Sequence, residues 1–380
     1  MKILILNYEY PPLGGGAGVV SKYQAEGLCA LGHDVTVLTA WFKGEQEDTQ
    51  NGNLRIIKLK SKREYIHKSN FTNWLSWIIK SKKFLKTHLK DNNYEYCLAH
   101  FALPGGEVAR YIKRKFKIPY SVISHGQDIP WFFPRQMFKY HLITYFWIKR
   151  ICLDAERIIL LTEQMKKNAD SFMGKYQAKN QVVPNGCDTG IFKPDYSKRD
   201  KLLKILYIGR LVSQKDPFTF LKAIKILADK KNFHFKVNIL GDGPLLNKMK
   251  RFCLKNNLND FVEFKGWINK EEMLNEYQSS HIQVISSKAE AMSMSALEAL
   301  SAGIYLISTP VSGNTDMITP GVNGDFFSFK DFKALADKIK EYYINKFLTE
   351  YVVPEDSMEE FWKRFDWKNI NGMLEKTITL

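Results

Sequence analysis

Both halves of this chain repeat one pattern, in which short apolar runs alternate with longer segments of helical spacing. In the first half, the run KILILNY at 2–8 is typical of a buried strand, and 19–32 has the apolar spacing of a helix ended by Gly32. In the second half, a run at 204–210 precedes a helical segment at 217–231. Further strands are expected at 33–40, 55–59, 96–100, 120–124 and 157–162, and at 236–243, 262–267, 281–287 and 304–310. Strands that alternate with helices favour an α/β fold, with parallel sheets covered by helices on both faces.

A segment rich in Pro, Gly, Asn and Asp, at 183–200, lies between the two halves and is typical of a linker. We therefore predict two Rossmann-like, doubly wound domains, at 1–190 and 191–358, for which 380 residues are long enough. Such domains bind ligands at the carboxyl ends of their strands. Two in tandem are expected to face each other across a ligand-binding cleft.

The charge of the chain is strongly basic and unevenly placed. The net charge is +16, and residues 55–90 hold 11 basic residues against one acid, Glu64. Such an excess favours an anionic surface as partner, either membrane or nucleic acid, and a solvated basic face is the alternative. Five scattered cysteines, none in Cys-x-x-Cys spacing, predict neither a disulfide framework nor a zinc site. With no signal-peptide pattern and no apolar window of about 18 residues, the sequence predicts a cytoplasmic protein.

Two glutamates eight residues apart, Glu290 and Glu298, stand in SSKAEAMSMSALEALSAG at 286–303. A strand is expected to end near Ser287 and a helix to start near Ser293 or Met294, which places one carboxylate at the mouth of the helix and one inside it. Carboxylates there can accept hydrogen bonds from sugar hydroxyls, and the free amides of the helix N-terminus favour a phosphate. Two solvated charges are the alternative, but the Ala, Met and Ser residues between them argue against a charged solvent face.

Two cations, Arg210 and Lys215, follow a strand in YIGRLVSQKDP at 207–217. At the end of a strand they could neutralise a diphosphate leaving group. The alternative is a pair of surface charges beside a helix start, since Asp216 and Pro217 resemble a cap and a first helical residue.

A histidine, His125, ends the β-rich run in SVISHGQD at 121–128, where Gly126 allows a tight turn. Its imidazole could therefore point into a cleft, although a lone histidine is more often structural. Asp128 is expected to orient it or to cap the next segment.

A glycine turn follows the first strand, with Gly14, Gly15, Gly16 and Gly18. Glycines let backbone amides approach a phosphate or a sugar closely. The spacing is not that of the dinucleotide fingerprint, and no Gly-Lys-Ser/Thr closes a phosphate loop. A nicotinamide enzyme and a Walker-type nucleotide hydrolase are thus disfavoured.

Taken together and in this order, these motifs resemble those of the family 4 glycosyltransferases, which have the GT-B fold. The resemblance runs through almost the whole chain and rests on YPPLGGGAG, LGHDVTVLT, PYSVISHGQD, VPNGCDTGIFKP, YIGRLVSQKDP, ILGDGPL, VEFKGW, the two-glutamate segment and STPVSGNTDMITPGVNGDFF.

The resemblance implies transfer of a sugar from a nucleotide donor, with retention of anomeric configuration and with no metal or cofactor. It implies that Arg210 and Lys215 hold the donor diphosphate, that Gly15 and Gly16 sit over the phosphates, and that Glu298 holds the ribose. The catalytic residues would be His125 and Glu290, and the sugar would contact Glu290, Ala291, Met292 and Ser293. The physics agrees, because without an Asp-x-Asp metal motif fixed cations and helix amides must stabilise the leaving diphosphate.

The resemblance also assigns the domains. The first would bind the acceptor, the second the donor nucleotide, and residues 359–380 would form a closing helix, seen in the pattern at 361–378, that crosses back to the first domain. One position departs from the family, Ala291, where glycine is usual. Ser293 also stands where glycine is frequent. Alanine does not tolerate a strained positive φ, which leaves the sugar pocket and the hexose open. We expect a UDP-sugar donor, with GDP-mannose next, and a glycan or lipid-linked glycan acceptor.

The segment 71–90 has helical apolar spacing, and lysines occupy its remaining face. With the basic residues before it, this pattern predicts that residues 55–90 dock on an anionic inner leaflet as a peripheral membrane contact, and not on nucleic acid. The alternative is that Trp74, Ile78 and Leu85 pack the helix onto the sheet of the first domain.

Two other functions remain open from the residues alone. A sugar-nucleotide epimerase can share the two-domain architecture, but acid and base carboxylates for it cannot be placed. A non-catalytic basic adaptor of membranes or nucleic acid is the alternative from another class. Release of free nucleotide in the presence of an acceptor distinguishes a transferase from both.

Overall fold

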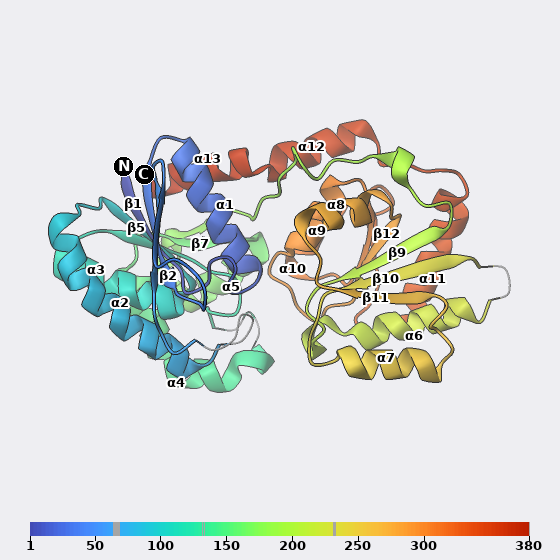
Figure 1. The fold of residues 1–380 in the computed structure, drawn as a ribbon, viewed down its shortest axis with the longest axis horizontal. Coiled ribbons are helices and arrows are strands. Elements are labelled where there is room, and N and C mark those ends of the chain that lie inside the picture. The colour runs from blue at the N-terminus through green and yellow to red at the C-terminus, as the bar shows by residue number, and fades with distance from the viewer. Residues whose placement is uncertain (64–68, 131, 133, 231–232, 380) are drawn as a thin grey trace. The chain divides into compact units, whose positions relative to one another are not determined.

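The computed structural model describes residues 1–63, 69–130, 132, 134–230 and 233–379. The chain divides into two compact units: unit 1 is Met1–Asn185 with Trp367–Leu380, and unit 2 is Gly186–Asp366. Each unit has a largely parallel sheet with helices around it (Figure 1), as the α/β prediction required. The boundaries expected from the sequence, after residues 190 and 358, differ from these division points by five and eight residues.

Unit 1 is built on a sheet whose described strands run in the order β3-β4-β2-β1-β5-β6-β7-β8. Among them only β3 pairs antiparallel, with β4. The strands are β1 (Lys2–Leu6), β2 (Asp34–Ala40), β3 (Asp48–Asn51), β4 (Leu54–Leu59), β5 (Tyr96–His100), β6 (Tyr120–Ile123), β7 (Ile158–Leu160) and β8 (Asn180–Val182). Each strand predicted in this half is present. The sequence missed β3 and β8 because both are short and carry little or no apolar alternation.

The helices of unit 1 follow the strands as expected. They are α1 (Gly16–Ala30), α2 (Phe71–Asp91), α3 (Glu107–Phe116), α4 (Pro134–Asp154), α5 (Glu163–Met173) and α13 (Trp367–Thr379). Short helical turns cover Phe101–Gly106 and Gly174–Lys179. No helix among the described residues is both long and apolar enough to cross a membrane.

The apolar face of the helix α2 is buried. Ile78 is 5% exposed, Leu85 0% and the neighbouring Trp77 0%, so this face packs inside unit 1. The packing alternative is therefore confirmed for Ile78 and Leu85. The lysines Lys80, Lys83, Lys86 and Lys90 lie exposed on the other side.

The C-terminal segment differs from the prediction. A single helix was expected over 361–378, but two helices, α12 (Glu355–Phe365) and α13, meet at Asp366. Asp366 leaves the helical conformation, with φ −66° and ψ 135°, and its backbone pairs with that of Cys187. The sequence does not reveal this break, since the pairing partner lies far away along the chain.

Within unit 1, α13 packs against α1. The rings of Tyr23 and Trp367 stack with centroids 5.1 Å apart. Asn371 occupies the space above Gly27, where any Cβ would lie 1.8 Å from the Asn371 amide nitrogen. His33 Nε2 lies 2.8 Å from a carboxylate oxygen of Glu375.

Unit 2 has a parallel sheet whose described strands run in the order β11-β10-β9-β12-β13-β14. They are β9 (Leu203–Ile208), β10 (Phe235–Leu240), β11 (Val262–Gly266), β12 (Ile282–Ile285), β13 (Tyr305–Ser308) and β14 (Gly324–Phe326). Its helices are α6 (Pro217–Ala228), α7 (Leu246–Lys255), α8 (Lys270–Gln278), α9 (Met294–Ser301), α10 (Ser312–Met317), α11 (Phe332–Tyr342) and α12, with short turns at Tyr196–Lys198, Ser213–Lys215 and Tyr343–Phe347. The core lies between the sheet and α6, α7 and α11, with Phe220, Val237 and Leu335 fully or almost fully buried. Only β14 was missed here, for its shortness.

Some predicted features fall outside the described residues. They are residues 64–68 of the basic segment 55–90, residue 231 of the helix expected at 217–231, and residue 380.

Candidate active site

The two loops that carry the predicted donor-binding residues follow neighbouring strands of unit 2. β9 and β12 pair in parallel, with Ile205 opposite Ile282. Parallel neighbours end at the same edge of a sheet. The loop after β9, with Arg210 and Lys215, therefore lies beside the loop after β12, with Glu290.

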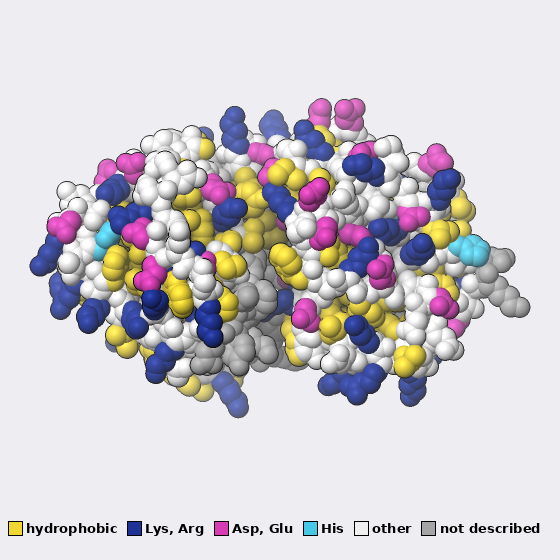
Figure 2. Space-filling model, viewed as in Figure 1, with side chains coloured by type: hydrophobic (Ala, Val, Ile, Leu, Met, Phe, Trp, Pro, Cys, Tyr) yellow, Lys and Arg dark blue, Asp and Glu magenta, His cyan; other side chains and the backbone are white. Residues whose placement is uncertain are grey.

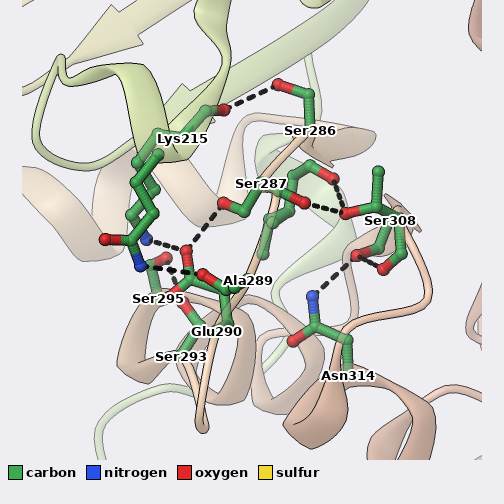
Figure 3. Close-up of polar contacts among 12 residues, drawn as sticks. Lys215, Ser286, Ser287, Ala289, Glu290, Ser293, Ser295, Ser308 and Asn314 are labelled. Carbon is green, nitrogen blue, oxygen red and sulfur yellow. Dashed lines mark hydrogen bonds and ion pairs between the residues drawn. The ribbon is translucent and has the colours of Figure 1, made fainter. Parts of the chain in front are cut away.

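Hydrogen bonds join these two loops directly. The Gln214 side chain donates to the carbonyl of Ala289 at 2.8 Å, and the Lys288 amide donates to the carbonyl of Gln214 at 2.8 Å. The hydroxyl of Ser286 donates to the carbonyls of Lys215 and Asp216, at 3.0 and 2.8 Å. Figure 3 shows the hydrogen bond between Lys215 and Ser286, which is one of these contacts between the two loops. The loops are thus held as one surface.

An ion pair joins the two loops through their functional side chains (Figure 3). Lys215 Nζ lies 2.6 Å from Glu290 Oε1, and the Ser287 hydroxyl donates to the same oxygen at 2.6 Å. The side chains of Lys215 and Glu290 are 19% and 11% exposed. The stem of Lys215 passes over Gly209, where a Cβ would lie 3.5 Å from Lys215 Cε; it is the φ of +140° that favours glycine at this position. The sequence predicted separate partners for these two charges and did not predict that they pair.

Arg210 lies in the same loop as Lys215 but is exposed. No side-chain hydrogen bond or ion pair to another described residue holds it. A guanidinium in this position can turn toward an anion without breaking a contact.

The second glutamate, Glu298, lies within α9 and is partly buried. Tyr277 of α8 donates its hydroxyl to Glu298 Oε2 at 3.1 Å. Burial raises the pKa of Glu298 to about 7, against the lowering effects of this hydrogen bond and of Lys270. A carboxyl group with such a pKa exchanges a proton near neutrality and can accept or donate a hydrogen bond to a diol. Tyr277 was not predicted from the sequence.

The helix α9 begins at Met294, as predicted, with Ser293 as its N-cap. The Ser293 hydroxyl lies 3.1 Å from that of Ser295 rather than on a helix amide. Before the cap, the backbone of Ala291 and Met292 packs on Gly313, where an added Cβ would lie 2.5 Å from the Ala291 carbonyl oxygen. Ala291 has no positive φ. The alanine that departs from the family pattern therefore fits its backbone without strain.

The histidine predicted in the first half, His125, follows β6 in unit 1 and does not stand alone. Its Nε2 lies 3.0 Å from Nδ1 of His100, the last residue of the neighbouring strand β5. Phe101, which follows His100 with φ +64°, places its ring 4.7 Å from that of His125. Burial lowers the pKa of His125 to about 3 and holds that of His100 well below its usual value. Both imidazoles are therefore neutral at physiological pH.

The tautomers of this histidine pair follow from its surroundings. His100 is fully buried, and no described residue is a hydrogen-bond partner for its Nε2. An unpaired buried acceptor is tolerated better than an unpaired buried N–H. In the tautomer pair that we propose, His100 Nδ1–H donates to His125 Nε2, and His125 carries its own proton on Nδ1. The sequence did not single out His100.

Asp128 fixes the turn that carries His125. Its carboxylate accepts hydrogen bonds from the amides of His125 and Ala102, at 3.1 and 2.9 Å, and from the hydroxyl of Ser124 at 2.8 Å. Of the two expected roles it thus orients His125, through the backbone rather than through the imidazole. Burial raises the pKa of Asp128 despite these donors.

The glycine turn leads directly into α1. Gly15 is the N-cap and Gly16 the first helical residue, so the helix starts three residues earlier than predicted. Gly14 has φ +93°, and a Cβ at Gly18 would lie 2.9 Å from the Leu13 carbonyl oxygen. Both positions therefore need glycine. The first free amides of α1 therefore follow Gly15, and a helix N-terminus of this kind can bind a phosphate.

Among the described residues, no group of three or more His, Cys, Asp or Glu side chains could hold a metal ion.

Comparisons with known proteins cover both units. Residues 14–190 match the family model Glycosyltransferase Family 4, and residues 188–355 match the model Glycosyl transferases group 1. An uncharacterized glycosyltransferase of Methanocaldococcus jannaschii is 24% identical over 391 residues, which cover 97% of this chain and 96% of that protein. The UDP-Gal:alpha-D-GlcNAc-diphosphoundecaprenol alpha-1,3-galactosyltransferase of Escherichia coli is 29% identical over 173 residues, which cover 42% and 44%.

Solved structures agree on the fold. Sucrose-phosphate synthase from Thermosynechococcus elongatus superposes with a TM-score of 0.85 at 18% identity, over 99% of this chain and 98% of that one. Anabaena HepE in complex with UDP-glucose gives 0.76 at 15% identity, over 100% and 99%. Two Rossmann-like units with these matches define a glycosyltransferase with the GT-B fold. The chain belongs with the family 4 glycosyltransferases, as its motifs indicated.

Proposed function

We propose that this enzyme transfers a hexose from a UDP-sugar to a glycan acceptor, with retention of configuration and without a metal ion. The observation that carries the proposal is the pairing of Lys215 with Glu290, at 2.6 Å, beside the start of α9. It places a fixed cation, a carboxylate and helix amides at one edge of a parallel sheet. Those are the groups that a sugar diphosphate needs.

In the proposed mechanism the bound donor breaks this ion pair and gives each of its two side chains a new partner. The diphosphate takes Lys215 Nζ, and Glu290 becomes free to accept hydrogen bonds from the sugar hydroxyls. Because the exchange leaves both charges compensated, neither is stranded in a partly buried site. As the bond from sugar to phosphate breaks, negative charge grows on the leaving group. Lys215, Arg210 and the amides of α9 then stabilise it.

Other residues complete the proposed donor site. Glu298, steadied by Tyr277, binds the ribose hydroxyls, and the sugar lies against Glu290, Ala291, Met292 and Ser293. In unit 1, the backbone amides at Gly15 and Gly16 are suited to a phosphate, and neutral His125 is suited to donate a hydrogen bond to a sugar hydroxyl. We assign no protein nucleophile, because the one carboxylate nearby, Glu290, contacts sugar hydroxyls in this proposal.

The identity of the donor has support from related proteins. HepE is solved with UDP-glucose, and the Escherichia coli relative is named for UDP-Gal. GDP-mannose is the second candidate, since no described contact excludes a guanine. That relative is also named for a diphosphoundecaprenol acceptor, which supports a lipid-linked glycan as the acceptor here.

A lipid-linked acceptor would bring the enzyme to a membrane, and we propose that it works in the cytoplasm at the inner face. The basic segment 55–90 supplies attraction to anionic lipid through exposed Lys80, Lys83 and Lys86. The apolar face of α2 is not available for insertion, because Ile78 and Leu85 are buried. We retain no role for nucleic acid.

The test is a thermal-shift and turnover assay with UDP- and GDP-sugars in excess EDTA. A donor at 100 times its Kd stabilises the folded state by about 2.7 kcal/mol. We expect a UDP-sugar to raise Tm, and nucleotide to be released only when an acceptor is present. A strict requirement for manganese or magnesium would contradict metal independence. Release of an epimerised donor without an acceptor would favour an epimerase.

A further inference from the structure

One helix of unit 1 exposes an apolar face that nothing described covers. On α4, Phe138, Leu142, Ile143 and Phe146 are 53%, 70%, 82% and 75% exposed. Phe138, Leu142 and Phe146 are spaced by four residues and share one side of the helix, and Ile143 widens it. Scattered exposed apolar residues are ordinary on a surface, but four large ones on one helix face are not.

The opposite side of α4 is buried in unit 1. His141, Ile148 and Ile151 are 1%, 0% and 0% exposed. The His141 Nε2 and the carbonyl of Gln127 are 3.1 Å apart, and Trp74 of α2 meets Tyr140 edge-on at 5.9 Å. α4 therefore buries one face in unit 1 and keeps a second apolar face toward solvent.

Basic side chains stand among the exposed apolar ones. Lys139 lies four residues before Ile143, Arg150 four residues after Phe146, and both are exposed. No aspartate or glutamate occurs from residue 138 to 153. Figure 2 shows hydrophobic and basic side chains close together along the lower edge of unit 1, where Figure 1 places α4.

We propose that this face of α4, consisting of Phe138, Lys139, Leu142, Ile143, Phe146 and Arg150, is the surface that enters an anionic lipid bilayer. An apolar face of aromatic and branched side chains, with cations interspersed and no acid, matches the headgroup boundary of such a membrane. A protein partner is less suited, because lysine is depleted at the core of protein interfaces. The inference rests on the proposed lipid-linked acceptor for its purpose. The apolar contact with the membrane, which the sequence suggested for α2, is thereby assigned to α4.

The test is flotation of the full chain with vesicles of neutral lipid alone or with anionic lipid added. The first variant is Leu142→Gln with Ile143→Gln, at the two middle positions of the face. We expect it to lower the partition coefficient on anionic vesicles by roughly tenfold or more, since two apolar side chains no longer enter the lipid. Lys139→Gln with Arg150→Gln should lower it by about fivefold per charge, and only on anionic vesicles.

The matched control is Leu254→Gln with Ile344→Gln, which changes two apolar residues of unit 2 that are 67% and 55% exposed. We expect this control to bind vesicles like the wild type. Every variant should keep the Tm shift with UDP-glucose, because the altered side chains are exposed and none of them is assigned to the donor site. A wild-type chain that binds vesicles but shows no Tm shift with UDP-glucose would count against the donor assignment alone.

Three results would overturn the proposal. The first is vesicle binding that the Leu142 and Ile143 changes leave intact. The second is no binding to either kind of vesicle. The third is a wild-type chain that self-associates in sedimentation equilibrium and becomes monomeric in the same variant, which would make a second copy the occupant of this face.

Discussion

Replacing Glu298 with glutamine should stabilise the free enzyme and weaken its nucleotide binding. Burial raises the pKa of this carboxyl from 4.5 to about 7. Between these pH values the folded state holds a proton that the unfolded chain releases, so stability falls as pH rises. Below pH 4.5 there is no penalty, and above pH 7 the penalty is complete.

The magnitude follows from the same values. At about 1.4 kcal/mol for each pH unit, a rise from 4.5 to about 7 costs about 3.5 kcal/mol when the group is ionised. The carboxylate is withdrawn from water although the residue is only partly buried, so we treat this figure as an upper bound. Glutamine has nearly the same shape and keeps an oxygen that can accept the Tyr277 hydroxyl.

The assay is thermal unfolding of Glu298→Gln and wild type at pH 5 and pH 8. At pH 8 we expect a rise in Tm of roughly 5–10 °C for the transition of unit 2, and at pH 5 only a small one. The affinity for UDP should fall by about 10- to 100-fold, because a charged partner of the ribose hydroxyls is lost.

Glu276 provides a control of opposite sign. Burial would raise its pKa, but Lys265, at 2.6 Å, with Asn238 and Lys204 outweighs burial and lowers it. The stability from this ionised group is present above the unfolded pKa and disappears as pH falls through the folded one. Glu276→Gln should therefore destabilise the enzyme at pH 8. A Glu298→Gln protein that is no more stable than wild type at pH 8, or that binds UDP unchanged, would refute the reasoning.

Three further predictions concern Lys215 of the donor loops, the histidine pair and Gly313 of α10. Lys215→Ala should lower turnover by roughly two to three orders of magnitude while the fold survives, whereas exposed Lys288→Ala should stay within a few-fold of wild type. Equal effects would contradict the proposed role of Lys215 in holding the diphosphate. His100→Gln removes the imidazole that fixes the tautomer of His125, so it should lower kcat more than it changes the KM for the donor. An unchanged kcat would make His100 purely structural. Gly313→Ala should cost about 1–3 kcal/mol in a urea titration, because its Cβ would lie 2.5 Å from backbone, whereas Gly372→Ala, with open space around it, should be neutral or stabilising by roughly 0.5–1 kcal/mol.

The order of strands and helices could be predicted because it is written in local patterns. Apolar runs such as 204–210 and helical spacing such as 217–231 need only neighbouring residues to form. The positions of Arg210, Lys215 and Glu290 after strand ends follow from the same patterns. Parallel topology then brings those ends to one edge of the sheet.

The pairing of side chains could not be predicted from these local patterns. Lys215 and Glu290 are 75 residues apart, and their 2.6 Å contact depends on the register of β9 with β12. His100 meets His125 because β5 and β6 end together. The short polar strand β3 forms only because β4 offers it an edge.

The sequence by itself therefore determined the class of fold, the family and the residues that flank the donor loops, since each is a local pattern or a motif. Only the tertiary structure decided which charges neutralise each other and which apolar faces remain exposed. The face of α2 that looked suited to lipid is packed inside unit 1, and the face of α4 is not. Periodicity reports that a helix has an apolar face, but burial depends on what the rest of the chain places against it.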